Sequence, residues 1–140
     1  GSKIAVTGFG RTGRVLTAML QGLGAYVTVV TREGGERAFA EIEGCRAVSF
    51  TDLIKDAYDI DVIINTVPAL VIDEQILSGL KSDCLIIEIA SAPFGIDFKK
   101  AETLGLNVII AGSLPGKAAP KTAGEIVADA ILNIIKEELI

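Results

Sequence analysis

Short apolar runs alternate with helical patterns along this sequence, and this alternation is the feature that most limits its fold. It predicts a parallel sheet with helices on both faces, because parallel neighbours need a crossover connection that is usually a helix. The expected strands are residues 3–7, 26–30, 47–50, 61–66, 85–89 and 108–111. The expected helices are residues 12–23, 36–43, 52–58 (with Thr51 as its N-cap), 73–80, 99–104 and 120–139. The predicted fold class is α/β, a doubly wound parallel sheet.

The size and composition exclude several classes of protein. A chain of 140 residues is enough for one domain, and a half-hydrophobic composition with 22% charged residues excludes a disordered tail. No apolar run reaches the roughly 18–20 residues that a membrane helix needs, so no membrane contact is expected. A net charge of −5 without a basic stripe argues against nucleic-acid binding. No signal peptide precedes the first strand, which predicts a cytoplasmic location.

The chain contains no histidine, which removes Ser-His-Asp and Cys-His catalysis and every zinc site that uses histidine. Cys45 and Cys84 fit no metal-ligand spacing, and we expect both to be buried, reduced thiols. The sequence therefore predicts no metal site.

A G-x-G-x-x-G motif at residues 8–13 follows the first expected strand and opens the first expected helix. In this context Gly8 permits the tight turn, Gly10 lets the backbone approach a pyrophosphate, and Gly13 allows close packing of helix and strand. Free N–H groups at the helix start point at the anion. The alternative is a glycine-rich turn with no ligand. The motif predicts a dinucleotide-binding domain of the Rossmann type over residues 1–140, with these contacts: Gly8, Phe9, Gly10, Arg11, Thr12 and Gly13.

The end of the second strand carries the choice between NAD and NADP. NAD-specific domains usually place an acidic residue there, about 20 residues after the motif. Thr31 occupies that position, 18 residues after Gly13, and Arg32 follows it. A hydroxyl and a guanidinium suit a 2′-phosphate better than a 2′-hydroxyl, so we expect Thr31 and Arg32 to favour NADP. Glu33, if it turns inward, leaves NAD open as the alternative.

The ends of the later strands carry small residues, prolines and lysines. Ligands of doubly wound sheets sit beyond the carboxyl ends of the strands, so we expect these loops to shape the nicotinamide half of the site and a substrate site. Lysines at the entrance of the last expected helix are unfavourable unless an anion binds there. Ordinary turn chemistry is the alternative for the first two loops. The residues concerned are Thr66, Val67, Pro68, Ala90 and Ser91 for the nicotinamide, and Lys117, Lys121 and Thr122 for substrate carboxylates.

Three segments together carry a family resemblance: residues 8–13 (GFGRTG), 64–71 (INTVPALV) and 114–124 (LPGKAAPKTAG). With them, almost the whole chain resembles the nucleotide-binding domain of the dipicolinate synthase A subunits. The resemblance implies a sporulation enzyme that oxidises a dihydrodipicolinate-type ring to pyridine-2,6-dicarboxylate with NADP as hydride acceptor. It also implies two partners for this domain, namely an additional N-terminal domain and a flavoprotein-like B subunit.

The expected function is thus the NAD(P)-binding part of a two-domain oxidoreductase that acts on a small dicarboxylate ring and forms a homo-oligomer. No general base is assigned; a lysine, a carboxylate of the other domain or water remain open. One alternative is the cofactor domain of a shikimate-, hydroxyacid- or alanine-dehydrogenase-like enzyme. Another is a non-enzymatic dinucleotide-sensing module, which has no need of the lysines in residues 112–124.

Overall fold

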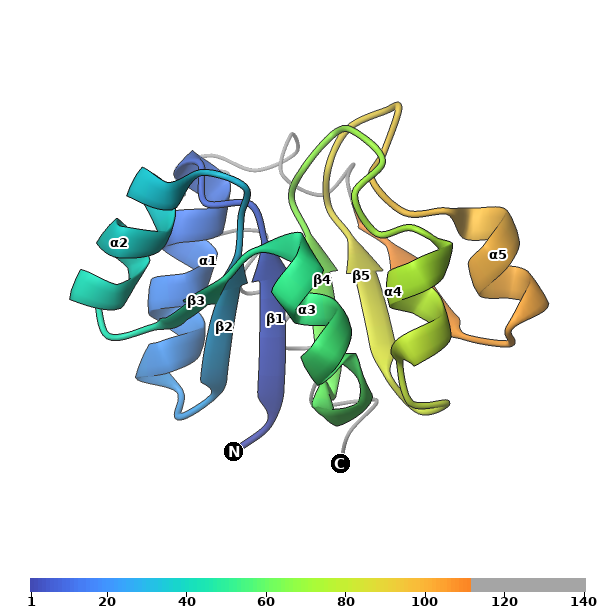
Figure 1. The fold of residues 1–140 in the computed structure, drawn as a ribbon, viewed down its shortest axis with the longest axis horizontal. Coiled ribbons are helices and arrows are strands. Elements are labelled where there is room, and N and C mark those ends of the chain that lie inside the picture. The colour runs from blue at the N-terminus through green and yellow to red at the C-terminus, as the bar shows by residue number, and fades with distance from the viewer. Residues whose placement is uncertain (112–140) are drawn as a thin grey trace.

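The computed structural model describes residues 1–111 and contains a six-stranded sheet in the order β3-β2-β1-β4-β5-β6, in which every pair of neighbours is parallel (Figure 1). The chain builds one half of the sheet outward from β1, crosses back, and builds the other half outward from β4. This arrangement confirms the predicted doubly wound fold. The strands are β1 (Lys3–Thr7), β2 (Tyr26–Val30), β3 (Arg46–Val48), β4 (Val62–Asn65), β5 (Leu85–Glu88) and β6 (Asn107–Ile110).

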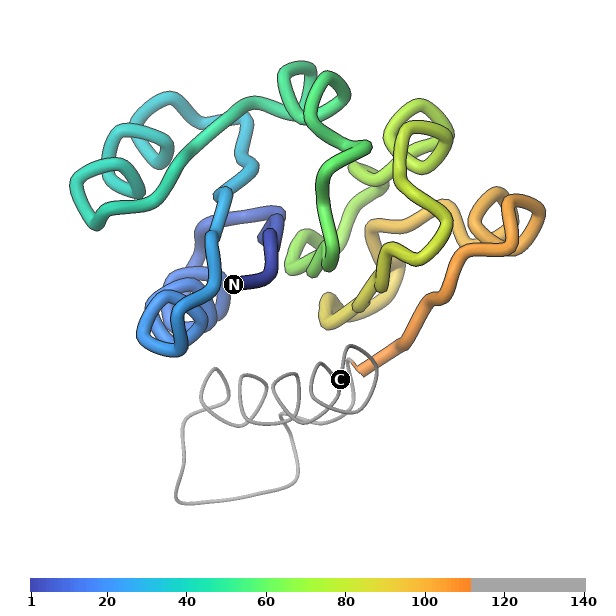
Figure 2. The backbone as a smooth tube through the Cα atoms, turned by 90° about the horizontal axis from the view of Figure 1, so that it is seen from below, coloured from blue at the N-terminus to red at the C-terminus, as the bar shows by residue number. Residues whose placement is uncertain are grey.

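The helices lie on both faces of the sheet. Figure 2 shows α1 on one side and α3, α4 and α5 on the other. Apolar side chains of β1, β4 and β5 therefore find helices on either face, which is why these strands are continuous hydrophobic runs. The helices are α1 (Arg11–Gly22), α2 (Gly34–Ile42), α3 (Phe50–Asp56), α4 (Glu74–Gly79) and α5 (Phe98–Thr103), and a 3-10 turn, η1 (Ala57–Asp59), follows α3.

The core is divided by the sheet into two main clusters. Ile63 and Ile86, both fully buried, point toward α3, α4 and α5. Ile64 and Ile87, also fully buried, join Leu16 of α1 on the opposite face. Because strand side chains alternate between faces, adjacent isoleucines of one strand fill both clusters. The two clusters hold β1 and β4 rigidly side by side at the centre of the sheet.

The boundary between β3 and α3 differs from the prediction. Residues 47–50 were expected to form a strand, but β3 ends at Val48 and Phe50 begins α3. The expected N-cap, Thr51, was wrong as well. Ser49 is the N-cap, since its hydroxyl oxygen accepts a hydrogen bond from the Asp52 N–H at 3.2 Å. A side chain that satisfies a free N–H of the first turn fixes the helix start, whatever strand propensity surrounds it.

Both cysteines are buried free thiols, as expected. Burial raises the pKa of Cys84 to about 12 and also raises that of Cys45. Within residues 1–111, no helix is long and apolar enough to cross a membrane.

Candidate functional site

A cleft of about 490 Å³ opens at the carboxyl ends of β1, β2 and β4. In Figure 1 this edge of the sheet is at the top, where β1 and β4 send their chains in opposite directions. Such a switch point leaves a gap between the two connections, and ligands of doubly wound sheets bind there. The lining residues are Gly8, Phe9, Gly10, Arg11, Thr12, Gly13, Thr31, Arg32, Glu33, Glu36, Phe50, Thr66, Val67, Pro68 and Val71.

The turn after β1 brings the chain into the cleft through Gly8. Its φ of +91° lies in the region that favours glycine. A Cβ at Gly8 would lie 2.4 Å from the Thr66 hydroxyl oxygen, so the loop after β4 packs directly on this turn. The Thr66 hydroxyl donates to the Thr7 carbonyl at 2.6 Å, which fixes the two sides of the cleft to each other.

Helix α1 starts at the cleft without any side chain on its free N–H groups. Its N-cap, Gly10, provides no cap hydrogen bond, and the first turn holds no acidic residue. In contrast, Ser49, Asp73 and Asp97 accept N–H hydrogen bonds at the starts of α3, α4 and α5. A Cβ at Gly10 would meet nothing within 4 Å. The start of α1 is therefore an open cradle of N–H donors, which suits an anion.

The far wall of the cleft is formed by the end of β2 and the first turn of α2. The Thr31 hydroxyl donates to Glu36 Oε1 at 2.6 Å, and the Arg37 guanidinium donates to the Thr31 carbonyl at 2.7 Å. Thr31 is only 4% exposed, whereas Arg32 is exposed. The hydroxyl proton of Thr31 is thus already used by Glu36, and Arg32 is the free cation of this wall within the described residues.

Phe9 lies within the glycine motif and is 4% exposed. Its ring centroid is 6.2 Å from that of Phe39, and the Arg14 guanidinium lies 4.4 Å from the Phe39 centroid. This cluster joins α1 to α2. Phe9 therefore anchors the motif in the protein as well as lining the cleft.

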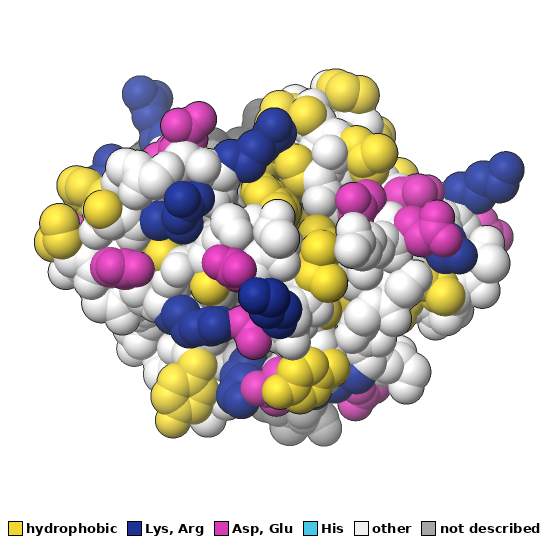
Figure 3. Space-filling view, in the orientation of Figure 1, with side chains coloured by type: hydrophobic (Ala, Val, Ile, Leu, Met, Phe, Trp, Pro, Cys, Tyr) yellow, Lys and Arg dark blue, Asp and Glu magenta, His cyan; other side chains and the backbone are white. Residues whose placement is uncertain are grey.

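The loops after β4 and β5 lie beside each other. The N–H groups of Val71 and Ile72 both donate to the Gly95 carbonyl, at 3.0 Å and 2.8 Å. The peptide bond between Ala92 and Pro93 is cis. Figure 3 shows hydrophobic side chains gathered at the top of the molecule, over these loops. Leu70, in the loop after β4, is 62% exposed.

The structure brings together most of the residues predicted for the site. Residues 8–13, Thr31, Arg32 and residues 66–68 all line the one cleft. Ala90 and Ser91 lie on the adjoining loop and are not among its lining residues. Lys117, Lys121 and Thr122 lie outside the described residues.

Sequence reasoning missed three lining residues, Glu36, Phe50 and Val71, and named Glu33 only as the alternative that would turn inward. Glu36 had a readable signal, because an acidic residue in the first turn of a helix after β2 is directed toward the carboxyl edge of the sheet. Phe50 had none, because it was assigned to the third strand.

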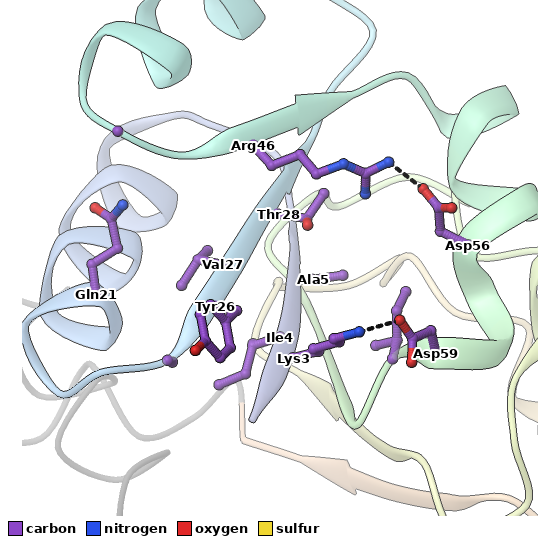
Figure 4. Close-up of a pocket in the computed structure, with 13 residues that line it drawn as sticks. Lys3, Ile4, Ala5, Gln21, Tyr26, Val27, Thr28, Arg46, Asp56 and Asp59 are labelled. Atoms are coloured by element: carbon purple, nitrogen blue, oxygen red, sulfur yellow. Dashed lines mark hydrogen bonds and ion pairs between the residues drawn. The ribbon is translucent and has the colours of Figure 1, made fainter. Parts of the chain in front are cut away.

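A second and larger hollow, of about 560 Å³, lies toward the opposite end of β1 and β2 (Figure 4). Its two cations are already paired: Lys3 with Asp59 of η1, and Arg46 with Asp56 of α3. Both pairs are exposed to solvent, and they leave no unpaired charge among the described residues of this hollow for an anionic ligand. The cleft at the carboxyl edge is therefore the better candidate site, although its volume is smaller.

Comparison with known proteins identifies the family of this domain. Residues 1–94 match the family described as "D-isomer specific 2-hydroxyacid dehydrogenase, NAD binding domain". The chain is 38% identical, over 98% of its length, to the A subunit of dipicolinate synthase from Bacillus subtilis, and it covers 46% of that protein. The resemblance found in the three sequence segments is thereby confirmed.

Solved structures agree. The A subunit of dipicolinate synthase from Bacillus halodurans superposes with a TM-score of 0.81 at 37% identity, over 96% of this chain and 46% of that one. The Bacillus subtilis protein gives the same TM-score and identity over 99% of this chain and 47% of that one. A formate dehydrogenase from Granulicella, at 13% identity, has a TM-score of 0.65 over 97% of this chain and 43% of that one, and shares the fold alone. The chain spans about half the length of the relatives it matches.

Proposed function

We propose that this chain, which belongs to the family of NAD-binding domains of D-isomer specific 2-hydroxyacid dehydrogenases, is the cofactor-binding half of an oxidoreductase. The observation that carries the proposal is the uncapped start of α1, which opens into the cleft beside Gly10. In this proposal, the other half of the same enzyme is a substrate domain.

The residues at the start of α1 fit a dinucleotide pyrophosphate. The space beside Gly10 is open, and the N–H groups of the first turn have no side-chain acceptor. Arg11 and Thr12, which line the cleft at this point, add a cation and a hydroxyl. These groups would hold the pyrophosphate by charge-assisted hydrogen bonds.

Arg32 supports NADP as the preferred cofactor. It is exposed at the wall formed by the end of β2, where the adenosine ribose of a dinucleotide binds in this fold. A guanidinium there would pair with a 2′-phosphate. Two carboxylates of the same wall, Glu33 and Glu36, oppose that phosphate, so we expect a preference of roughly tenfold, the low end of what one charge-assisted contact supplies.

The proposed reaction is oxidation of a dihydrodipicolinate-type ring to pyridine-2,6-dicarboxylate, as in the sporulation enzyme that the family resemblance implies. The nicotinamide accepts a hydride when bound, and the ring also loses a proton to become aromatic. The chain's own task is to orient the nicotinamide against the ring and exclude water. We assign the nicotinamide end of the cleft to Thr66, Val67 and Pro68, with Ala90 and Ser91 beside it.

Lys117, Lys121 and Thr122 are proposed to receive the substrate carboxylates. A dicarboxylate needs cationic donors, and these residues follow the sixth strand of the sheet. The proposed partners are a second copy of this chain and a flavoprotein-like B subunit.

Calorimetric titration with NADP⁺ and NAD⁺ tests the cofactor proposal. The chain should bind both, with NADP⁺ about tenfold tighter. Arg32→Ala should remove that preference, whereas Glu36→Gln, in the same wall, should increase it because one repelling charge is lost. Equal affinities in the unaltered chain, or an unchanged preference in Arg32→Ala, would refute NADP selection. Absence of binding by both dinucleotides would refute the function itself.

A further inference from the structure

Glu88, the last residue of β5, is fully buried. It is the only charged side chain that is buried among residues 1–111. No lysine or arginine of the described part forms an ion pair with it. A buried carboxylate destabilises the folded protein unless its oxygens are fully hydrogen-bonded, so the presence of Glu88 at this place needs an explanation.

Three N–H groups surround the Glu88 carboxylate. Oε1 accepts from the Ala90 N–H at 2.9 Å, and Oε2 accepts from the Gly95 N–H at 2.8 Å. The Asn65 side-chain amide donates to both oxygens, at 2.8 Å and 3.0 Å. All of these partners are donors, which is the arrangement that suits an ionised carboxylate. Peptide and amide dipoles stabilise the negative charge, but no ion pair with a described residue neutralises it.

These contacts connect Glu88 to both loops beside the cleft. It holds the first and last residues of the segment 90–95, because Ala90 and Gly95 donate to different oxygens. Through Asn65 it also holds the loop after β4, since Asn65 Nδ2 donates to the Val67 carbonyl at 2.9 Å and Asn65 Oδ1 accepts from the Val67 N–H at 3.1 Å. Asn65 Oδ1 accepts from the Thr7 hydroxyl at 2.7 Å as well, which links the network to β1.

Gly95 fits this arrangement only as glycine. A Cβ there would lie 2.2 Å from Asn65 Nδ2 and 2.5 Å from the Val67 carbonyl oxygen. The backbone of the second loop therefore rests directly on Asn65 and on the first loop. A shift of Glu88 would displace both loops together.

We propose that Glu88 is a positioning residue for the nicotinamide end of the cleft and that its buried negative charge favours the oxidised form of the bound cofactor. This rests on the proposed function, which assigns residues 66–68 and the adjoining loop to the nicotinamide. The oxidised nicotinamide is a cationic pyridinium and the reduced one is neutral. A fixed anion beneath the loops, in a region of low dielectric constant, stabilises the cation selectively.

The test compares the affinities of one chain for NADP⁺ and NADPH, by calorimetry, before and after Glu88→Gln. The variant keeps the shape, removes the charge, and turns an amide N–H₂ toward a backbone N–H. We expect the ratio of the two dissociation constants to change at least threefold, with NADP⁺ weakened more than NADPH. Glu88→Asp, which keeps the charge, should restore most of the ratio. Asp97→Asn is the matched control, because it removes one carboxylate charge at the start of α5 while an asparagine still caps the helix.

An equal loss of affinity for both forms, or no loss, would overturn the proposal. Failure of the unaltered chain to bind either form would overturn the proposed function, and the inference with it. Should Glu88→Gln not fold, Glu88→Asp decides, because it keeps the charge and shortens the side chain that holds the two loops. Weaker binding of both forms with a ratio within threefold of the unaltered chain supports the proposal, and a ratio changed by more than threefold although the charge is kept overturns it.

Discussion

Replacing Gly10 by alanine separates binding from stability in this protein. The backbone of Gly10, with φ −79° and ψ −163°, is extended and is accessible to alanine. The new Cβ would meet nothing within 4 Å, so no clash arises in the protein alone. The methyl group would occupy the space in which we place the pyrophosphate.

The expected change in stability follows from two small opposing effects. Alanine is a poorer N-cap than glycine by about 0.5–1 kcal/mol. In the opposite direction, alanine has less conformational freedom than glycine in the unfolded chain, which stabilises the folded protein by about 0.4–1 kcal/mol. The net change in unfolding free energy should stay within about 0.5 kcal/mol, which is about 2 °C in melting temperature for a chain of this size.

Gly13→Ala, three residues further on, is the matched comparison. Its Cβ would lie 2.7 Å from the Gly8 carbonyl oxygen, a backbone atom. Gly8 cannot move freely because its N–H donates to the Val30 carbonyl at 2.8 Å. Overpacking destabilises the folded protein by about 1–3 kcal/mol, and the better helix propensity of alanine offsets about 1 kcal/mol of this. The melting temperature should therefore fall by a few degrees.

Thermal melts followed by circular dichroism and titration with NADP⁺ provide the two measurements. Gly10→Ala should melt within about 2 °C of the unaltered chain and bind NADP⁺ more than roughly a hundredfold more weakly. Binding within threefold of the unaltered chain would refute the placement of the pyrophosphate. A melting temperature lowered as much as in Gly13→Ala would refute the open space at Gly10.

Three further predictions concern the core and the surface. Thr17→Val should stabilise the chain in urea unfolding by up to about 1 kcal/mol, because the buried Thr17 hydroxyl has no hydrogen-bond partner in the described part; a clear loss contradicts this. At pH 8 a thiol reagent should leave Cys84 unmodified in the folded protein and modify it after unfolding, because burial raises its pKa to about 12; rapid labelling of the folded protein contradicts this. The hydrogen bond from Lys81 lowers the pKa of Asp61, so its stabilisation is present above the unfolded value of about 3.9 and is lost as the pH falls through the lower folded value. Asp61→Asn should therefore lower the free energy of unfolding by about 0.2–1 kcal/mol at pH 7 and leave it unchanged at a pH below the pKa of Asp61 in the folded protein. An equal loss of stability at the two pH values contradicts this.

The parts of the fold that the sequence predicts are those set by local pattern. The buried strands are recognisable because their apolar runs are short and end in glycine, proline or polar residues. The start of α3 was misassigned, although Ser49 and Asp52 have the spacing of an N-cap and its first turn. The apolar residues Ala47, Val48 and Phe50 favoured a strand over residues 47–50, but the capping hydrogen bond of Ser49 begins α3 at Phe50.

The candidate site also has a part that the sequence predicts and a part that it does not. Residues 8–13 are contiguous, so their common position in the cleft follows from the strand, turn and helix around them. The hydrogen bonds between Thr31 and Glu36, and between Asn65 and Glu88, join separate elements of the fold. Hydrophobic periodicity along the sequence does not predict such pairs. Glu88 nevertheless gave a signal, because a carboxylate within a buried apolar strand requires donors from elsewhere in the fold.

The pairing of β1 with β4 has a consequence for the order in which this protein assembles. Thr7 and Asn65, which meet across that pair, are 58 residues apart in the chain. Closing so long a loop costs chain entropy before the contacts at its ends are gained, so we expect this pairing to form late in folding. The cleft is incomplete before this pairing, because residues 66–68 of the loop after β4 form one of its sides. A dinucleotide that needs both walls binds only after the chain has crossed its folding barrier, and it therefore lengthens the lifetime of the folded protein without hastening its formation.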